Sequence, residues 1–269
     1  MTAPVASSSA QLAAQRATIT ERLIAALSAY FASLGAWRDA DATRFTRQAV
    51  PLVQGAQQAL AGLVAAYLAQ QATQQTGTPV PAPVLPPSAV TNLRGVPASE
   101  VYTRPFKDVW AALAQNKTLE QAVAQGTSRL REVAEGDLQT TYAAANQQGM
   151  SRLPAQARPQ GWRRVLQGTS SCALCVLAST HHYTIRDLNP IHPGCDCTVE
   201  PTYGPQPGSD ATAERVHAAV RELTGSSSAG GRGTVDYRQV QITQTHGELG
   251  PMLARPGDHF TGPGAIPST

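Results

Sequence analysis

The residues of this chain best suited to chemistry are four cysteines and one histidine that fall within one short stretch. Cys172 and Cys175 form a C-x-x-C pair, and sixteen residues separate that pair from His192-Pro-Gly-Cys195-Asp-Cys197. A C-x-x-C turn presents both sulfurs to one point, and sixteen residues suffice for a reversal that brings the second group back. Two such groups of thiolate and imidazole ligands are what a tetrahedral Zn²⁺ site needs. The spacing therefore predicts a metal site.

Five candidate ligands compete for four coordination positions. Cys172, Cys175 and Cys195 are the strongest, and His192 is the preferred fourth ligand because its spacing to Cys195 repeats that of the first pair. Cys197 is the substitute, since residues two apart in an extended strand face the same side. A site filled in this way has no open position for water or substrate. We therefore expect a structural zinc ion, with no catalytic residues and no other cofactor.

Disulfides or free thiols are the alternative for an even number of cysteines. Residues 1–30 show no basic start followed by a compact apolar stretch, so no secretory signal is expected. A chain of 269 residues can also build a core without covalent staples. Both points favour metal, and metal analysis under reducing conditions decides between the two interpretations.

Composition limits the classes of partner. The net charge is only +3, and the positive charge is almost entirely arginine, which is typical of a GC-rich genome. Because binding to nucleic acid needs a concentrated basic face, this balance does not predict it. No stretch approaches eighteen apolar residues, so no membrane span and no membrane partner are expected. We expect a protein that is intracellular when it is made.

The pattern of apolar residues predicts a mainly α fold. Apolar residues recur at helical spacing through residues 11–35, and a second helix should begin after a cap at Asp39 or Asp41 and contain Pro51. Thr118 and Gln121 have the spacing of a capping box for a long later helix, which Gly126 and Gly136 interrupt. Short β-compatible segments flank the cysteines at 162–166, 183–185 and 198–200. Residues 210–223 are a candidate for one more helix, and 225–233 read as a flexible Gly/Ser segment.

These elements suggest five regions. An N-terminal helical hairpin (1–77) is followed by a Pro-rich linker (78–96), a central helical region (97–158), a Cys/His zinc-binding module with a small sheet (159–204), and a largely flexible tail (205–269). The proline run should be extended and act as a spacer. Two helices alone bury little surface, so the hairpin should lean on later helices or on another protein.

Other groups of residues suggest chemistry less specifically. His246-Gly-Glu248 has the H-x-E form of a zinc deaminase, but it follows the C-x-x-C pair instead of preceding it. His181 and His182 are more typical of a solvated turn than of ligands or a general base. Arginines at 158, 163 and 164 surround Trp162; a solvated arginine edge is the simpler interpretation, and a contact to phosphates or to an acidic partner is the alternative. No common hydrolase, zincin or P-loop motif occurs.

The cysteine and histidine pattern resembles that of the MuF-like minor capsid (head morphogenesis) proteins of tailed bacteriophages. The lead-in Gly161-Trp-Arg-Arg-Val-Leu-Gln-Gly168, the exit Thr198-Val-Glu-Pro201 and the later His246-Gly-Glu-Leu-Gly-Pro251 are similar to the actinobacteriophage branch. The specific part of the resemblance covers about residues 160–203. It carries over Cys172, Cys175, His192 and Cys195 as metal ligands, with Cys197 as an additional cysteine.

The resemblance implies a minor virion protein of the plain form, without a fused enzyme domain. Such a protein lies inside the procapsid near the portal, acts in head assembly or genome delivery, and is present in the host cytoplasm during assembly. Its implied partners are the portal protein, a scaffold or major capsid protein, and packaged DNA. Two alternatives stay open. A zinc-dependent nucleic-acid-binding module would show a steep salt dependence, and a deaminase-like zinc hydrolase would need an open metal position together with His246 or Glu248.

Overall fold

The computed structural model describes residues 8–167, 175, 178–179, 181–188, 197–204, 218, 241–246 and 250–254. Two compact units divide these residues. The helical unit holds residues 14–158 and 186–188. The sheet unit holds the described residues from 159 to 185, those from 197 onward, and residues 8–13. The helical unit thus contains the N-terminal helices, the proline-rich segment and the central helices together.

Two long helices open the chain. The first, α1, spans Ser8–Ala32, and the second, α2, spans Asp39–Thr76. The expected cap at Asp39 or Asp41 is wrong, because the N-cap of α2 is Arg38, whose backbone N–H donates to the carboxylate of Asp41 at 3.1 Å. An acceptor three residues into a helix satisfies a donor that has no helical partner, so Asp41 acts from inside the helix. Gly77 then ends α2 at φ 69°, a left-handed conformation that glycine adopts at low cost.

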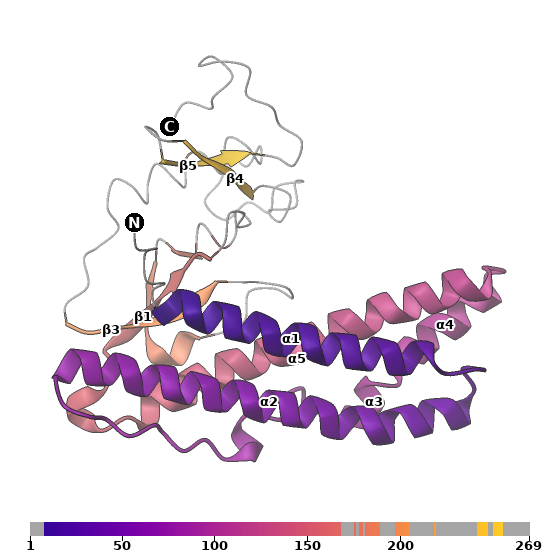
Figure 1. The fold of residues 1–269 in the computed structure, drawn as a ribbon, viewed down its shortest axis with the longest axis horizontal. Helices are drawn as coiled ribbons and strands as arrows, with labels where there is room; N and C mark the ends of the chain where they lie inside the picture. The colour runs from indigo at the N-terminus through magenta and orange to yellow at the C-terminus, as the bar shows by residue number, and fades with distance from the viewer. Residues whose placement is uncertain are drawn as a thin grey trace, which may run out of the picture. The chain divides into compact units, whose positions relative to one another are not determined.

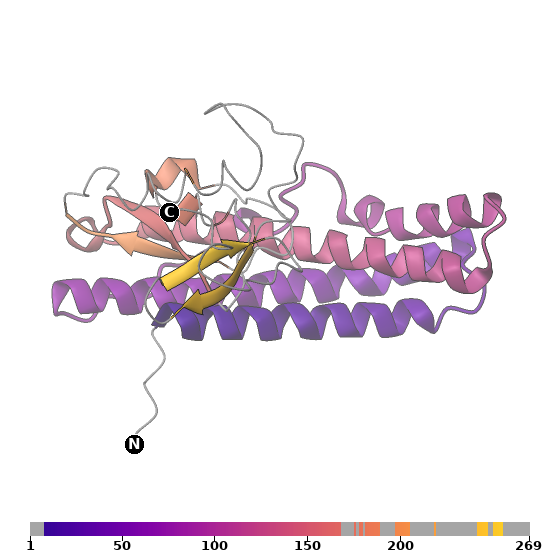
Figure 2. The same cartoon turned by 90° about the horizontal axis from the view of Figure 1, so that it is seen from above.

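The central region forms two short helices and one long helix. These are α3 (Ala98–Val101), α4 (Arg104–Ala114) and α5 (Leu119–Arg152). The predicted capping box is confirmed, because the Gln121 backbone N–H donates to Thr118 Oγ1 at 3.2 Å and the Thr118 N–H donates to Gln121 Oε1 at 3.1 Å. In Figures 1 and 2, α2 and α5 run side by side, and α4 folds back along α5. The expected mainly α body is confirmed.

An aromatic cluster joins three of these helices. Phe31 of α1 packs edge-on against Phe45 of α2 and Phe106 of α4, with ring centroids 5.5 Å and 5.0 Å apart. All three rings are buried. Trp110 adds a polar link, since its indole N–H donates to the backbone carbonyl of Trp37 at 2.6 Å. Edge-to-face aromatic pairs add attraction to the burial of apolar area, so this cluster anchors one end of the bundle.

The glycines expected to interrupt α5 instead lie within a continuous helix. A Cβ built on Gly126 would lie 2.5 Å from Val109 Cγ2 and 2.9 Å from the carbonyl oxygen of Pro105. A Cβ built on Gly136 would lie 2.7 Å from Nη2 of Arg94. The two glycines therefore permit close packing rather than a break in the helix.

We expect Gly126→Ala to lower the free energy of unfolding by about 1–3 kcal/mol, because the added methyl group has no room against backbone. Gly62→Ala is the matched control. Nothing lies within 4 Å of a Cβ at Gly62 in α2, so the change should raise stability by about 0.5–1 kcal/mol through helix propensity. Urea denaturation of both variants measures the difference, and equal effects of the two substitutions would contradict the close approach at Gly126.

Residues 78–97, which we call the strap, contain no α-helix and lie against the helices. The backbone N–H of Val80 donates to Thr73 Oγ1 at 2.9 Å, and Thr141 Oγ1 of α5 donates to the carbonyl of Val90 at 2.8 Å. A short 3₁₀ helix, η1 (Pro87–Ala89), interrupts the strap. The lack of α-helix agrees with the proline content, and these bonds attach the predicted spacer to α2 and α5.

A buried polar network holds the strap on α5. Arg94 forms an ion pair with Asp137, and the fully buried Tyr102 donates its hydroxyl to Asp137 Oδ2 at 2.9 Å. The Arg94 guanidinium also donates to the carbonyl of Val133 at 3.1 Å. Burial, with the adjacent Asp137 carboxylate, raises the pKa of Tyr102 well above its ordinary value. The hydroxyl therefore remains a proton donor at neutral pH.

The helix α2 is long and apolar enough to cross a membrane by length and composition alone. Core helices of bundles share these properties, and α2 buries Phe45, Val53, Leu60 and Leu68 within the protein. The absence of a membrane partner remains a prediction.

The sheet unit contains two small antiparallel sheets. In the first, β1 (Gly161–Val165) lies between β2 (His182–Tyr183) and β3 (Thr198–Thr202), which confirms the β-compatible segments around the cysteines. A 3₁₀ helix, η3 (Ile185–Asp187), takes the place of the strand expected to reach residue 185. The predicted 210–223 helix, apart from Ala218, and the Gly/Ser segment lie outside the described residues.

The second sheet lies within the region expected to be a largely flexible tail (205–269), and the flexibility of that region remains a prediction. Strands β4 (Gln241–His246) and β5 (Gly250–Ala254) pair with each other within the region taken as largely flexible. The β-branched residues Ile242, Thr243 and Thr245, followed by the glycines at 247 and 250, favour a hairpin here.

Candidate metal centre

The pairing of β1 with β3 fixes the base of the predicted metal module. The register runs from Gly161 opposite Thr202 to Val165 opposite Thr198. The chain thus leaves the ladder after Val165 and returns to it directly after Cys197. All five candidate ligands lie in the segment 166–197, between the ends of the two paired strands. Neighbouring strands therefore bring together the two ends of the segment that carries the ligands.

Two of the five candidates are within the described residues. Cys175 and Cys197 are both about 1% exposed. Cys172, His192 and Cys195 lie outside the described residues. Within the described part of the chain no three His, Cys, Asp or Glu residues gather closely enough to hold a metal ion. The zinc site therefore remains a prediction, and so does the choice between His192 and Cys197.

The surroundings of Cys197 suit a metal-binding thiolate. The buried side chain of Arg164 donates from Nη1 to Cys197 Sγ at 3.4 Å. The same guanidinium lies over the ring of Trp162, 5.0 Å from its centroid. A nearby arginine favours the thiolate over the thiol, and the thiolate is the form that binds Zn²⁺. The buried sulfur of Cys197, next to a fixed positive charge, therefore fits this ion.

An aromatic pair organises the rest of the module. Trp162 stacks on Tyr183 with centroids 4.4 Å apart, and its indole N–H donates to the carbonyl of Thr184 at 2.8 Å. The Tyr183 hydroxyl donates to the carbonyl of Ala178 at 3.0 Å. Burial raises the pKa of Tyr183, and the charge of Arg164 opposes that rise. These contacts connect β1 and β2 to the chain just after Cys175.

Each of the three arginines near Trp162 is held by a different contact. Arg163 points away from Arg164, as alternate residues of a strand do, and donates from Nε to Glu200 Oε1 at 3.1 Å. Arg164 is buried beside Cys197. Arg158, in the helical unit, donates to the carbonyl of Leu153 at 3.2 Å. The solvated-edge interpretation fits Arg163, whereas the sequence did not indicate that Arg164 turns inward.

Among the described residues, the histidines do not form a second candidate metal or catalytic site. His181 and His182 are exposed, and the His181 ring meets Tyr183 edge-on at 6.2 Å. This exposure agrees with the solvated interpretation of the pair. His246 ends β4, and Glu248 lies outside the described residues.

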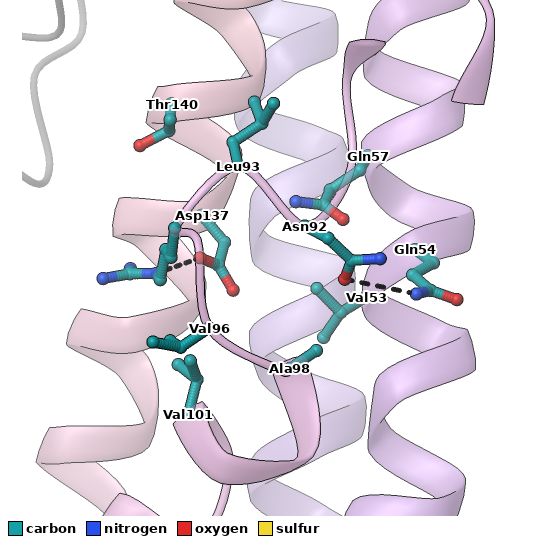
Figure 3. Close-up of a pocket in the computed structure, with 11 residues that line it drawn as sticks. Val53, Gln54, Gln57, Asn92, Leu93, Val96, Ala98, Val101, Asp137 and Thr140 are labelled. Atoms are coloured by element: carbon teal, nitrogen blue, oxygen red, sulfur yellow. Dashed lines mark hydrogen bonds and ion pairs between the residues drawn. The ribbon is translucent and has the colours of Figure 1, made fainter. Parts of the chain in front are cut away.

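A polar recess in the helical unit was not foreseen. Figure 3 shows Gln54 and Gln57 of α2, Asn92 of the strap and Asp137 of α5 around a common space. Glutamines in a Gln- and Ala-rich helix and one asparagine far along the chain form no recognisable motif. No sequence pattern could have connected residues on three separate elements.

Comparison with known protein families gives a match, which covers both the helical unit and the cysteine-bearing part of the sheet unit. The model of the VG15 protein family matches residues 4–224, and the chain belongs to that family. VG15 is a family of phage proteins, so the expectation of a phage protein is confirmed. The match does not extend to the MuF-like assignment. Neither the comparison with curated proteins nor the comparison with solved structures gives a match.

Proposed function

We propose that this chain is a minor capsid protein of the MuF-like type that acts in phage head assembly or genome delivery. It would lie inside the procapsid near the portal, in contact with the portal protein and with scaffold, major capsid protein or packaged DNA. The observation that carries the proposal is the reach of the family match. A single phage family spans both the helical unit and the segment with all five candidate ligands, which supports one protein with one role in the virion.

In this proposal the zinc ion is structural. Cys172, Cys175 and Cys195 would hold it, with His192 or Cys197 as the fourth ligand. Bound zinc would supply folding energy, because only the folded chain brings the ligands together. It would supply no chemistry, because a closed tetrahedral site leaves no position for a reacting water. The role of Arg164 is to donate to Cys197 Sγ and to offset the negative charge of the thiolates. An assembly role requires binding surfaces and no reaction, so the protein is proposed not to be an enzyme.

Co-expression with the portal protein of the same phage tests the proposal. We expect the tagged chain to retain the portal protein through affinity purification and size exclusion, and we expect the chain in purified virions at a few copies per particle. The major tail protein, co-expressed in the same way, is the control for unspecific retention. Absence of the chain from both portal complexes and mature virions would overturn the proposal.

A further inference from the structure

Cys197 and Arg164 lie on the buried face of the first sheet. The register places Arg164 opposite Val199, and residues opposite each other in an antiparallel ladder point to the same face. Cys197, directly before β3, shares this face with Val199, because alternate residues of an extended chain do so. All three side chains are buried, whereas the Arg163–Glu200 ion pair occupies the other face. The β1–β3 ladder therefore fixes the place of the Cys197 sulfur.

The chain just after the C-x-x-C pair reaches the same place through Tyr183. The Tyr183 hydroxyl donates at 3.0 Å to the carbonyl of Ala178, three residues beyond Cys175. Burial raises the pKa of Tyr183, the charge of Arg164 lowers it and the charge of Cys197 raises it, so both groups lie close to this hydroxyl. Cys175 is itself only 1% exposed. The two buried cysteines thus belong to one cluster of contacts.

The chain that leads to His192 is attached to α5. The carbonyl of Arg186 accepts from Gln147 Nε2 at 3.0 Å, and Leu188 is buried in the helical unit. His192 follows four residues after Leu188, whereas Cys197 directly precedes β3. The described contacts therefore attach the chain around Cys197 to the sheet and the chain before His192 to a helix.

The charge of Arg164 favours a site rich in thiolates. Its side chain is 7% exposed and donates from Nη1 to Cys197 Sγ at 3.4 Å. A buried cation is stabilised most by an adjacent anion. A zinc-bound thiolate is such an anion, whereas burial in apolar surroundings keeps a free thiol neutral. Zn²⁺ with four thiolates also carries one more negative charge than Zn²⁺ with three thiolates and an imidazole, and the guanidinium offsets that charge.

We infer that Cys197, and not His192, is the fourth ligand of the zinc ion, and that Arg164 is its positioning residue. The four ligands are then Cys172, Cys175, Cys195 and Cys197. Cys195 and Cys197 can bind one ion, because side chains two residues apart in an extended chain face the same side and sulfurs on one tetrahedral zinc are about 3.8 Å apart. The inference rests on the proposed structural zinc, and it holds whatever the partner of the protein in the virion.

X-ray absorption by the zinc-loaded full chain counts the ligands. We expect four sulfur neighbours at about 2.3 Å and no nitrogen neighbour at about 2.0–2.1 Å. His192→Asn should leave the spectrum and the zinc affinity unchanged, whereas Cys197→Ser should remove one sulfur neighbour. In protein loaded with ¹¹³Cd, scalar coupling should connect the metal to the β protons of Cys197 and to no ring proton of His192.

The possible failures have different signatures. Coupling of cadmium to the His192 ring, with a nitrogen neighbour that disappears in His192→Asn, would overturn the assignment and leave the structural zinc intact. Purified protein that binds neither zinc nor cadmium would overturn the metal site itself, and the assignment with it. Retention of the portal protein enters neither measurement, so the virion role is tested separately.

Arg164→Met tests the positioning role, and Arg163→Met, on the other face of β1, is the matched control. The change at Arg164 should weaken zinc binding about 10- to 100-fold, as removal of a group that contacts a metal ligand does, and shift the ¹¹³Cd resonance while four sulfurs stay bound. Arg164→Lys keeps the charge and should recover part of the affinity. Hydrogen exchange at saturating zinc reports whether each variant is folded. Equal zinc affinities of Arg164→Met and Arg163→Met would overturn the role of Arg164.

Discussion

Removal of zinc with a chelator under reducing conditions is expected to unfold the β1–β3 module and leave the helical unit folded. Structural zinc contributes about 10–16 kcal/mol to folding in isolated zinc-finger peptides, far more than a three-stranded sheet of short strands can replace. Hydrogen exchange should show loss of amide protection at 161–165 and 198–202. The circular dichroism of the long helices should change little, because α1, α2 and α4 share an aromatic core and α5 packs on α2 and α4.

Single substitutions identify the ligands. Cys175→Ser should lower zinc content and remove protection of β1 and β3 even when zinc is added back. Comparison of Cys197→Ser with His192→Ala in cobalt-substituted protein distinguishes the fourth ligand, because loss of a thiolate weakens the sulfur-to-cobalt charge-transfer band and loss of an imidazole does not. A structural zinc site would be contradicted if the purified protein contained no metal and its sheet were equally protected with and without chelator.

Replacement of Asp137 by alanine is expected to have the largest effect on the helical unit. The change leaves the Arg94 charge without its partner and the buried Tyr102 hydroxyl without an acceptor. Loss of one partner from a buried ion pair costs about 3–5 kcal/mol, and we expect the lower end because Arg94 keeps some access to water. Urea denaturation of the wild type and the variant measures this difference.

Two further variants divide that effect into its parts, and a third serves as a surface control. Tyr102→Phe removes one hydrogen bond and should cost about 1 kcal/mol. Asp137→Asn keeps an acceptor for Tyr102 but removes the charge, so its cost should lie between those of Tyr102→Phe and Asp137→Ala. Glu132→Ala breaks the exposed pair with Arg129 and should change stability by less than about 0.5 kcal/mol. A cost for Asp137→Ala no larger than that for Tyr102→Phe would contradict the role of the ion pair.

The local patterns of the sequence predicted the elements of this fold well. The helical spacing of residues 11–35 anticipates α1, the Thr118 capping box anticipates the start of α5, and the segments around the cysteines anticipate β1 and β3. Such signals depend only on residues a few positions apart, so the local periodicity of the sequence is enough to predict a helix or a strand.

Contacts between distant residues were outside the reach of those patterns. Prolines in the strap indicate an extended backbone, but nothing in them indicates that Arg94 meets Asp137 or that Thr141 binds Val90. In the same way, Gly126 reads locally as a helix breaker, whereas its role depends on the backbone of Pro105. The amides of Gln57 and Asn92 come together only because the strap folds back onto α2.

In the candidate metal centre, too, local spacing was predictable from the sequence and contacts between distant residues were not. The spacing of the cysteines and His192 indicates the ion, while the inward turn of Arg164 toward Cys197 depends on which face of β1 is buried. That choice is made by the stacking of Trp162 on Tyr183 and by the pairing with β3. Strand alternation alone allows either Arg163 or Arg164 to face the interior.

The register of β1 against β3 also bears on the affinity for metal. Bringing together the ends of a free loop as long as 166–197 costs about 3 kcal/mol of chain entropy. The β1–β3 ladder and a bound ion would close the same segment, so this cost is met once for both and each favours the formation of the other. Metal affinity and ladder stability are therefore linked, in the manner of a chelate effect built from backbone hydrogen bonds. Substitutions that weaken the strands, far from any sulfur, would loosen the ion.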